Sequence, residues 1–406
     1  MRKVLFTAAL LMAVNAVSAQ QSVVKEAKAA KGDPAKAAQI IEPALTNEAT
    51  AGDPETWKLA GDFQKAIYDS ENMKLYLPGQ KADTVKLYKS LGKLFDYYLK
   101  CDEVEQEKIK KGELKKPKLR KKLEKTLVSL RPNLTNGGSE AYNKGNYADA
   151  LNYFGLYVDA AQNPMFEDSP QVKNDTLVPL IANYAALAAN AEKNDKAMVK
   201  YGTIGKAHKE EGYRALMILA DVYGKKGGEM TDSVKWLDAI KEGVERFPAQ
   251  EYFTGNLMDY YIQHGKIDEG LAQITEIAAK NPTPYFLYVK GVLQYEKKDF
   301  EGARATFEEL IKKGGDFVAE AYSKIGDTYF FPGQEIVEAN SKISMDDPKY
   351  AEGEAKVKKL YEKALPYYQK AKELAPDKKQ LWGQYLLNIY WKLNKAEYDA
   401  LEKELK

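Results

Sequence analysis

The stretch LYVKGVLQYEKKDFEGARATFEELIKKGG, residues 287–315, decides the fold. Large apolar residues and one small residue recur in it at spacings of three and four, first around Gly291 and then around Ala303 and Phe307. This spacing predicts two amphipathic helices, which the short turn Lys297-Lys298-Asp299 joins. We expect Gly291 and Ala303 to face each other, because small residues let two helix axes approach to about 8–10 Å.

The same order of large and small residues returns along most of the chain. The preceding unit closes at Pro282, which follows Pro248 by 34 residues, and further copies begin near Leu134, Ile181, Leu216 and Tyr322. This period and pattern resembles the tetratricopeptide repeat over most of residues 32–405. The resemblance implies an all-α fold, a right-handed superhelical solenoid of antiparallel helix pairs with about seven or eight units, some of them with insertions.

Residues 1–19 have the pattern of a signal peptide. Two basic residues precede an apolar run from Val4 to Val14, which is too short to span a bilayer, and small residues lead to Ala19. We expect cleavage after Ala19 and a periplasmic or secreted chain. No cysteine follows the run, so the chain is not expected to be a lipoprotein. The leader resembles those of exported proteins from Bacteroidetes-like Gram-negative bacteria.

The repeat pattern is weaker in the N-terminal part of the chain than in the rest, and this difference predicts that the chain has two parts. We expect residues 20–131 to form a degenerate helical segment, and residues 132–406 to form the main array with capping helices at its C-terminal end. A solenoid needs such a cap because its last repeat would otherwise expose an apolar face.

Two insertions interrupt the pattern. In residues 330–356, Phe331-Pro332-Gly333 and Asp346-Asp347-Pro348 predict turns that break both helices of a unit, since proline and glycine favour turns. Residues 69–83, which contain Pro78-Gly79, predict a second insertion.

Composition excludes several classes of partner and chemistry. The chain has 61 Lys and Arg against 59 Asp and Glu, and only six are arginine, which argues against nucleic-acid binding. Cys101 is the only cysteine, so no internal disulfide is possible, and we expect a buried thiol. Two histidines, His208 and His264, lie in different units, and no Cys or His pair has metal-ligand spacing. We therefore expect no metal, no cofactor, no catalytic residue and no enzymatic activity.

In the family that the repeat resembles, ligands contact the concave wall formed by the first helix of each pair, helix A. The position after each small residue holds aspartate in four of the seven units, and these residues are Asp62, Asp221, Asp259 and Asp327. Carboxylates there suit the Lys and Arg side chains or the free N–H groups of an extended peptide.

Tyrosines extend this predicted wall. The repeat register places five of them toward it: Tyr142, Tyr252, Tyr285, Tyr288 and Tyr295. Tyrosine suits recognition because its ring is apolar and its hydroxyl can form hydrogen bonds. Other tyrosines at repeat positions are expected in the core: Tyr147, Tyr201, Tyr223, Tyr261 and Tyr368.

Two functions fit these features. The first is a non-enzymatic extracytoplasmic scaffold that binds a protein or peptide client, or an envelope complex, on the concave helix A surface. The alternative is a glycan-binding accessory protein in envelope nutrient uptake.

Overall fold

A computed structural model describes residues 21–280 and 283–406. These residues form helices and connecting turns without a β-strand, which confirms the predicted all-α helical repeat fold. The chain divides between Ala239 and Ile240 into two compact units, called unit 1 and unit 2 below. The predicted leader and Pro282 lie outside the described residues.

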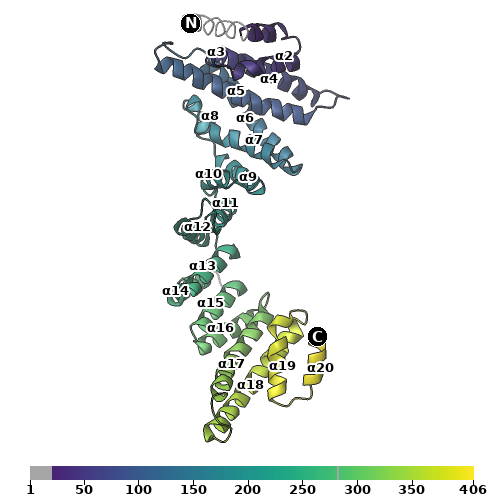
Figure 1. Cartoon of the computed structure of the whole chain (residues 1–406), viewed down its shortest axis with the longest axis vertical. Helices are drawn as coiled ribbons and strands as arrows, with labels where there is room; N and C mark the ends of the chain where they lie inside the picture. Colours follow the sequence, from purple (N-terminus) through teal and green to yellow (C-terminus); the bar gives the residue numbers. More distant parts are fainter. Residues whose placement is uncertain (1–20, 281–282) are drawn as a thin grey trace, which may run out of the picture. The chain divides into compact units, whose positions relative to one another are not determined.

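Unit 1 consists of paired helices with short helical turns between some of them (Figure 1). Helix α4 pairs with α5, α6 with α7, and α9 with α10, and α9 also contacts α11. The elements are α2 (Pro34–Ile41), η1 (Glu42–Leu45), α3 (Glu48–Ala51), α4 (Pro54–Lys74), α5 (Thr84–Lys110), α6 (Arg120–Asn143), α7 (Tyr147–Ala160), η2 (Pro164–Phe166), α8 (Pro170–Lys173), α9 (Val178–Ala191), α10 (Asp195–Gly205) and α11 (Gly212–Gly224). Helix α12 (Ser233–Arg246) contains the boundary between the units.

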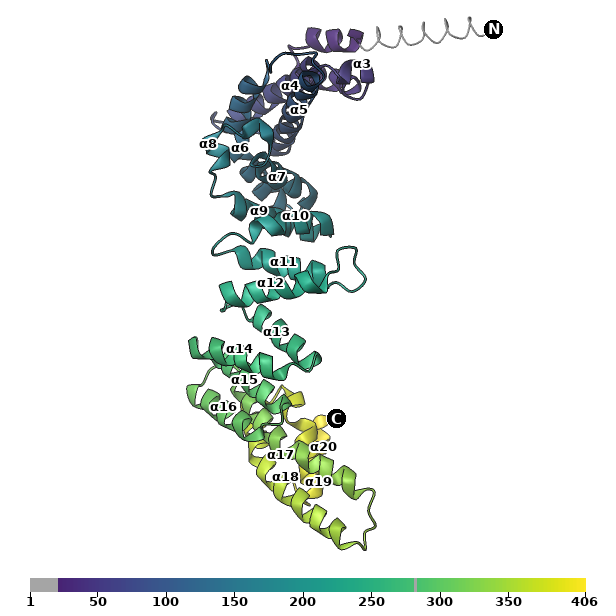
Figure 2. The same ribbon diagram turned by 90° about the vertical axis from the view of Figure 1, so that its left-hand side faces the viewer.

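Unit 2 continues the pairing, with α13 against α14, α15 against α16, and α17 against α18 (Figure 2). The first helices α13, α15 and α17 also contact one another in order, which forms a helix A face. The elements are α13 (Glu251–Gln263), α14 (Ile267–Lys280), α15 (Pro284–Glu296), α16 (Phe300–Lys313), α17 (Val318–Asn340), α18 (Pro348–Leu374), η3 (Lys379–Leu381), α19 (Gly383–Lys392) and α20 (Tyr398–Leu405).

Asp-Pro pairs begin several of these helices. Asp33, Asp53 and Asp347 are the N-cap residues of α2, α4 and α18, and each carboxylate accepts a hydrogen bond from a backbone N–H of the first turn. The proline that follows each aspartate fits the first helical position, where no N–H is needed. These pairs therefore define where the helices start.

Within a pair, a glycine of the first helix packs against an aromatic ring of the second. A Cβ on Gly291 would lie 2.5 Å from the Phe307 ring, and Gly138 stands equally close to the ring of Phe154. In both pairs the glycine and the ring are 16 residues apart. The expectation that Gly291 faces Ala303 is thus corrected, because the ring of Phe307 fills the space beside Gly291.

The predicted break at Phe331-Pro332-Gly333 is wrong, whereas the chain does turn over residues 341–347, next to Pro348. Helix α17 runs through Pro332 to Asn340, and Asp347 caps the start of α18 instead of ending a helix. Packing against α18 explains the continuity, because Phe330 stacks on Tyr361 at 5.1 Å and Gly333 lies against the same ring. The insertion therefore lengthens both helices of one pair, which lie side by side in Figures 1 and 2.

The insertion at residues 69–83 has a similar form. It includes the last turn of α4 and a loop over residues 75–83. Gly61 of α4 still packs against the Tyr98 ring of α5, as in the shorter pairs. The boundary that we predict after residue 131 falls inside α6 and stays a prediction.

The expectation of a buried thiol at Cys101 is confirmed. Its side chain is fully buried in α5, and Sγ donates a hydrogen bond to the Pro54 carbonyl oxygen at 3.1 Å. Burial raises the pKa of this thiol to about 12, so it stays protonated and unreactive at neutral pH. A separate property of the described chain is that none of its helices has the length and apolar character needed to cross a bilayer.

Candidate functional site

In unit 1 the three predicted binding residues lie in separate places. Asp62 on α4 accepts hydrogen bonds from the Tyr98 hydroxyl at 2.7 Å and from Lys58 Nζ at 2.6 Å, so both of its oxygens have partners. Asp221 on α11 is exposed beside a small cavity that Lys193 and Lys225 also line. Unit 1 therefore does not bring these carboxylates together in one row.

The third residue, Tyr142, lines a cavity of about 390 Å³. Aromatic side chains dominate its wall, and Tyr142 meets Tyr147 edge to face at 5.1 Å. The full lining is Ser139, Tyr142, Asn143, Phe154, Tyr184, Leu187 and Arg214. Sequence reasoning found Tyr142 but missed Tyr184 and Arg214, which line the same cavity.

In unit 2 three predicted tyrosines share one face of α15, called the tyrosine face below. Tyr285, Tyr288 and Tyr295 are all half-buried. The Tyr288 ring stacks on Phe317 at 5.1 Å, and the Tyr285 hydroxyl donates to the Glu251 carbonyl oxygen of α13 at 3.0 Å. These contacts fix the rings while part of each remains accessible.

Charged residues of α17 lie next to the tyrosine face. Lys324 Nζ is 5.2 Å from the centroid of the Tyr295 ring and 2.9 Å from Asp327 Oδ2. The other oxygen of Asp327 accepts a hydrogen bond from the Tyr368 hydroxyl of α18 at 2.7 Å. Asp327 is only 2% exposed, so it positions Lys324 and Tyr368 and does not lie open to solvent.

The pKa values of this cluster follow from burial and charge. Burial lowers the pKa of Lys324, but the carboxylate of Asp327 more than offsets this, and the net pKa is raised. Burial also raises the pKa of Tyr285 to about 12, and it raises those of Tyr288 and Tyr295. At neutral pH the tyrosines are therefore hydrogen-bond donors beside a charged Lys324.

The remaining two predicted residues lie on α13, the helix next to α15. Asp259 is exposed, and its charge acts on Tyr285. Tyr252 is half-buried and meets Phe253 edge to face at 5.3 Å. Sequence reasoning missed Lys324, although it lies three residues before Asp327, about one helical turn, and could have been found from it.

The expected core tyrosines are mostly buried. Tyr201, Tyr223, Tyr261 and Tyr368 are all less than one-tenth exposed, whereas Tyr147 is only half-buried beside Tyr142. Repeat register therefore separates core from surface for most of these tyrosines.

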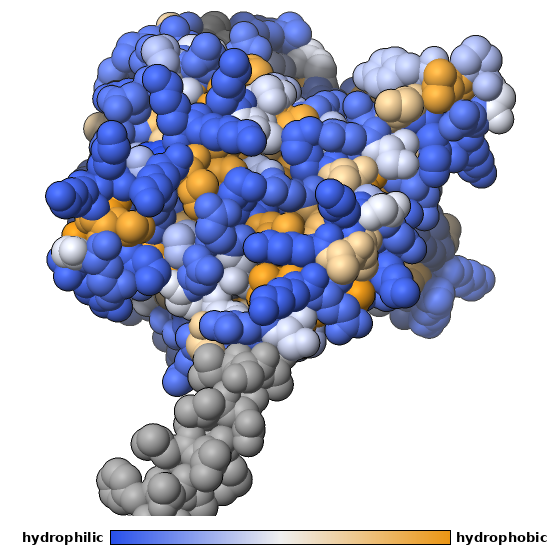
Figure 3. All heavy atoms as spheres, turned by 90° about the horizontal axis from the view of Figure 1, so that it is seen from above, coloured by the Kyte–Doolittle hydropathy of each residue, from blue (hydrophilic) through white to orange (hydrophobic). Residues whose placement is uncertain are grey.

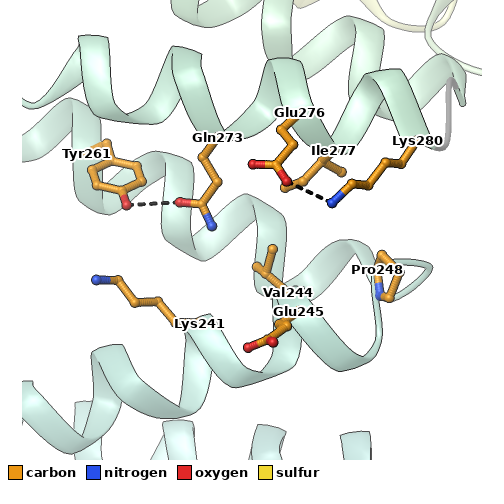
Figure 4. A pocket seen from close by; sticks show the side chains of 9 residues that line it. All are labelled: Lys241, Val244, Glu245, Pro248, Tyr261, Gln273, Glu276, Ile277 and Lys280. Carbon is orange, nitrogen blue, oxygen red and sulfur yellow. Dashed lines mark hydrogen bonds and ion pairs between the residues drawn. The ribbon is translucent and has the colours of Figure 1, made fainter.

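A further cavity, of about 570 Å³, is lined by none of the predicted site residues (Figure 4). Its wall comes from α12, α13 and α14, and includes Val244, Ile277 and Pro248. The Tyr261 hydroxyl donates to Gln273 Oε1 at 3.0 Å, and Lys280 pairs with Glu276 at the rim. Of its charged residues, Glu276 and Lys280 are paired with each other, and Lys241 and Glu245 point apart (Figure 4).

No cluster of three potential metal ligands occurs within residues 21–280 and 283–406. Unit 2 has aromatic rings beside an ion pair, the one between Lys324 and Asp327.

The Tyr368 hydroxyl donates a hydrogen bond to Asp327, and removing it tests whether this bond stabilises the cluster of Lys324, Asp327 and Tyr368. Tyr368→Phe is expected to lower the free energy of unfolding by about 1–3 kcal/mol, because a buried carboxylate oxygen loses its donor. Urea unfolding measures this, with Tyr367→Phe on the same helix as the control. Equal stability of both variants would contradict a structural role for the Tyr368–Asp327 hydrogen bond.

Comparisons with known proteins give a family for part of the chain. Residues 256–316 match the family model described as tetratricopeptide repeat. A search of curated protein sequences finds no match.

Several solved structures are similar to this chain. A TPR repeats protein from Bacteroides fragilis is 17% identical, with a TM-score of 0.33, and the alignment covers 64% of this chain and 98% of that one. A tetratricopeptide repeat protein from Parabacteroides merdae is 15% identical, with a TM-score of 0.35, and the alignment covers 64% of this chain and 98% of that one. The C-terminal part of a TPR repeat-containing protein from Cytophaga hutchinsonii is 16% identical, with a TM-score of 0.39, and the alignment covers 66% of this chain and 92% of that one.

The matched residues cover α14, α15 and α16 and most of α13, which are the helices that carry Asp259 and the tyrosine face. Their antiparallel pairing and the glycine-to-ring contact within the pair agree with the family's repeat. The tetratricopeptide repeat family is therefore identified for residues 256–316, the segment that its family model matches.

Proposed function

We propose that the chain is a non-enzymatic extracytoplasmic scaffold that binds a peptide or protein client on the helix A face of unit 2. The tyrosine face is the observation that carries this proposal. Tyr285 and Tyr288 are held by the Glu251 carbonyl oxygen and the Phe317 ring, and Tyr295 packs against Phe300 at 5.6 Å, so binding costs little side-chain entropy. Tetratricopeptide repeat proteins commonly mediate protein–protein interaction, which agrees with this role.

The charges around the tyrosine face suggest the chemistry of the client. Asp259 is exposed and forms no ion pair among the described residues, whereas Lys324 is held by Asp327. A client with an apolar side chain over the Tyr288 ring and a basic side chain near the Asp259 carboxylate would complement both the ring and the carboxylate. The extracytoplasmic location rests on the signal-peptide pattern of residues 1–19.

The test is an affinity capture from the source cell envelope with the wild type and the variant Asp259→Lys/Tyr288→Ala, compared by mass spectrometry. The variant is expected to lose a client that the wild type retains, because it removes one ring and reverses one charge. Glu309→Lys is the matched control, since Glu309 is an exposed acid on α16 outside the helix A face. Identical captures from all three proteins would contradict the proposal.

The alternative function, glycan capture, would use the same tyrosine rings. A glycan array with the wild type and the double variant distinguishes the two. Binding of a defined glycan that the variant loses would replace a protein client by a carbohydrate.

A further inference from the structure

The loop between α4 and α5 exposes an unusual number of apolar side chains. Its tip, defined here as residues 73–81, is called the α4–α5 tip. Met73 is 61% exposed, Leu75 is 50% exposed and Tyr76 is 79% exposed, and Leu77 follows directly. The tip projects beyond its neighbours at the right of Figure 1, and Figure 3 shows apolar side chains at the end of a projection on the same side.

The backbone of the tip is ordered by its own turn. Gln80 N donates to the Leu77 carbonyl oxygen at 3.3 Å, and Gly79 between them has a φ of 74°. Proline before a glycine of positive φ is the sequence of a type II turn, and Pro78 precedes Gly79 here. The turn therefore holds Leu77 and its apolar neighbours outward in the unbound chain.

The charged residues at the base of the tip include more lysines than acids. Glu71 is buried and accepts hydrogen bonds from Lys74 Nζ at 2.9 Å and from Asp83 N at 3.0 Å. Lys81 is exposed and forms no ion pair among the described residues, whereas Lys86 Nζ lies 3.4 Å from Glu71 Oε1 and stays largely exposed. Residues 71–86 hold three lysines, Lys74, Lys81 and Lys86, against two acids, Glu71 and Asp83, so the base of the tip has a small positive excess.

We propose that the α4–α5 tip inserts into the surface of an anionic lipid bilayer. Its outermost residues are apolar, a tyrosine lies among them, and lysines stand behind them, which is the order of polarity at the bilayer interface. A projecting apolar tip can insert into the fluid hydrocarbon of a bilayer, which needs no preformed pocket. A protein partner would need a pocket that fits the tip. The lysines then contact the headgroup phosphates, and insertion stops where the carboxylates of Glu71 and Asp83 begin.

The test places an environment-sensitive label at the tip of the full chain. Gln80→Cys carries a nitrobenzoxadiazole group, and buried Cys101 does not compete for it. Vesicles of phosphatidylethanolamine and phosphatidylglycerol are expected to shift its emission to shorter wavelength and raise its intensity. Met345→Cys, which places the label at the exposed connection between α17 and α18, is the control and is expected to keep its spectrum.

A second variant adds Leu75→Ser, Tyr76→Ser and Leu77→Ser to the labelled Gln80→Cys chain, and it is expected to lose the shift. All three residues are exposed in or beside the loop, so circular dichroism should show an unchanged fold. Either of two results overturns the proposal. An unchanged spectrum at position 80 would leave a protein partner as the occupant of the tip, and a shift that survives the serine substitutions would show that the apolar side chains do not insert.

Discussion

Phe307→Ala is expected to lower the free energy of unfolding of unit 2 by about 3–5 kcal/mol, the range for removing a buried phenylalanine. Phe307 is fully buried on α16 and fills the space beside Gly291. It also lies in a core cluster with Leu287 and Ile325, so its loss opens a cavity between two helix pairs. Urea unfolding followed by circular dichroism measures the change.

Two further variants show whether the contact between glycine and ring is responsible. Gly291→Val alone is expected to destabilise by about 1–3 kcal/mol, because the added methyl groups collide with the ring. In the Phe307→Ala background the same substitution is expected to recover part of the loss, since valine then fills the cavity. Glu309→Ala on the exposed side of α16 is the control. If the two effects simply add, the ring and the glycine are not coupled and our account of the pair is wrong.

Arg131→Met is expected to lower the free energy of unfolding of unit 1 by about 3–5 kcal/mol, because it leaves a buried carboxylate without its cation. Arg131 is 4% exposed on α6, its Nη1 is 2.6 Å from Asp175 Oδ2, and its guanidinium lies 3.7 Å from the centroid of the Tyr157 ring. The double variant Arg131→Met/Asp175→Asn is expected to recover part of this loss. No recovery would show that Arg131 acts through packing and not through charge.

The effect of Arg131 should depend on pH. Burial raises the pKa of Asp175, but hydrogen bonds from Tyr157, the Leu177 N–H and Arg131 outweigh it, so the pKa is lowered in the folded chain. The carboxylate therefore stabilises the fold above the ordinary aspartate pKa of about 3.9, and this contribution is lost as the pH falls through the lowered value. The difference between wild type and Arg131→Met should shrink over the same acidic range, and a constant difference would contradict the pairing.

Periodicity predicted the helix pairs because each repeat buries an apolar stripe at helical spacing. Gly291 and Phe307 were both found this way, although their partnership was not, since spacing along one helix does not say which residue of the second helix reaches a given space. The local turn signal failed at Pro332, inside α17, whereas Pro348 follows a turn and begins α18. Proline can continue or begin a helix, and packing against α18 or a capping aspartate decides which.

For the site, register placed Tyr285, Tyr288 and Tyr295 on one helix face, where the structure also has them. It could not show that Asp327 is buried, because burial there depends on Tyr368, which lies 41 residues further along the chain. The apolar α4–α5 tip was read only as an insertion. Its exposure became visible once the lengths of α4 and α5 were known.

The two long hairpins have a consequence for how such a chain can change. Gly61 with Tyr98 and Gly326 with Tyr368 keep the glycine-to-ring contact of the short pairs, although many more residues separate them. Added length therefore lies at the ends of the two helices and in the loop between them, beyond the contact between glycine and ring. New surface can be acquired there by insertion while the spacing between repeats stays constant, so a lineage could remodel what the hairpin ends touch without rebuilding the array that carries them.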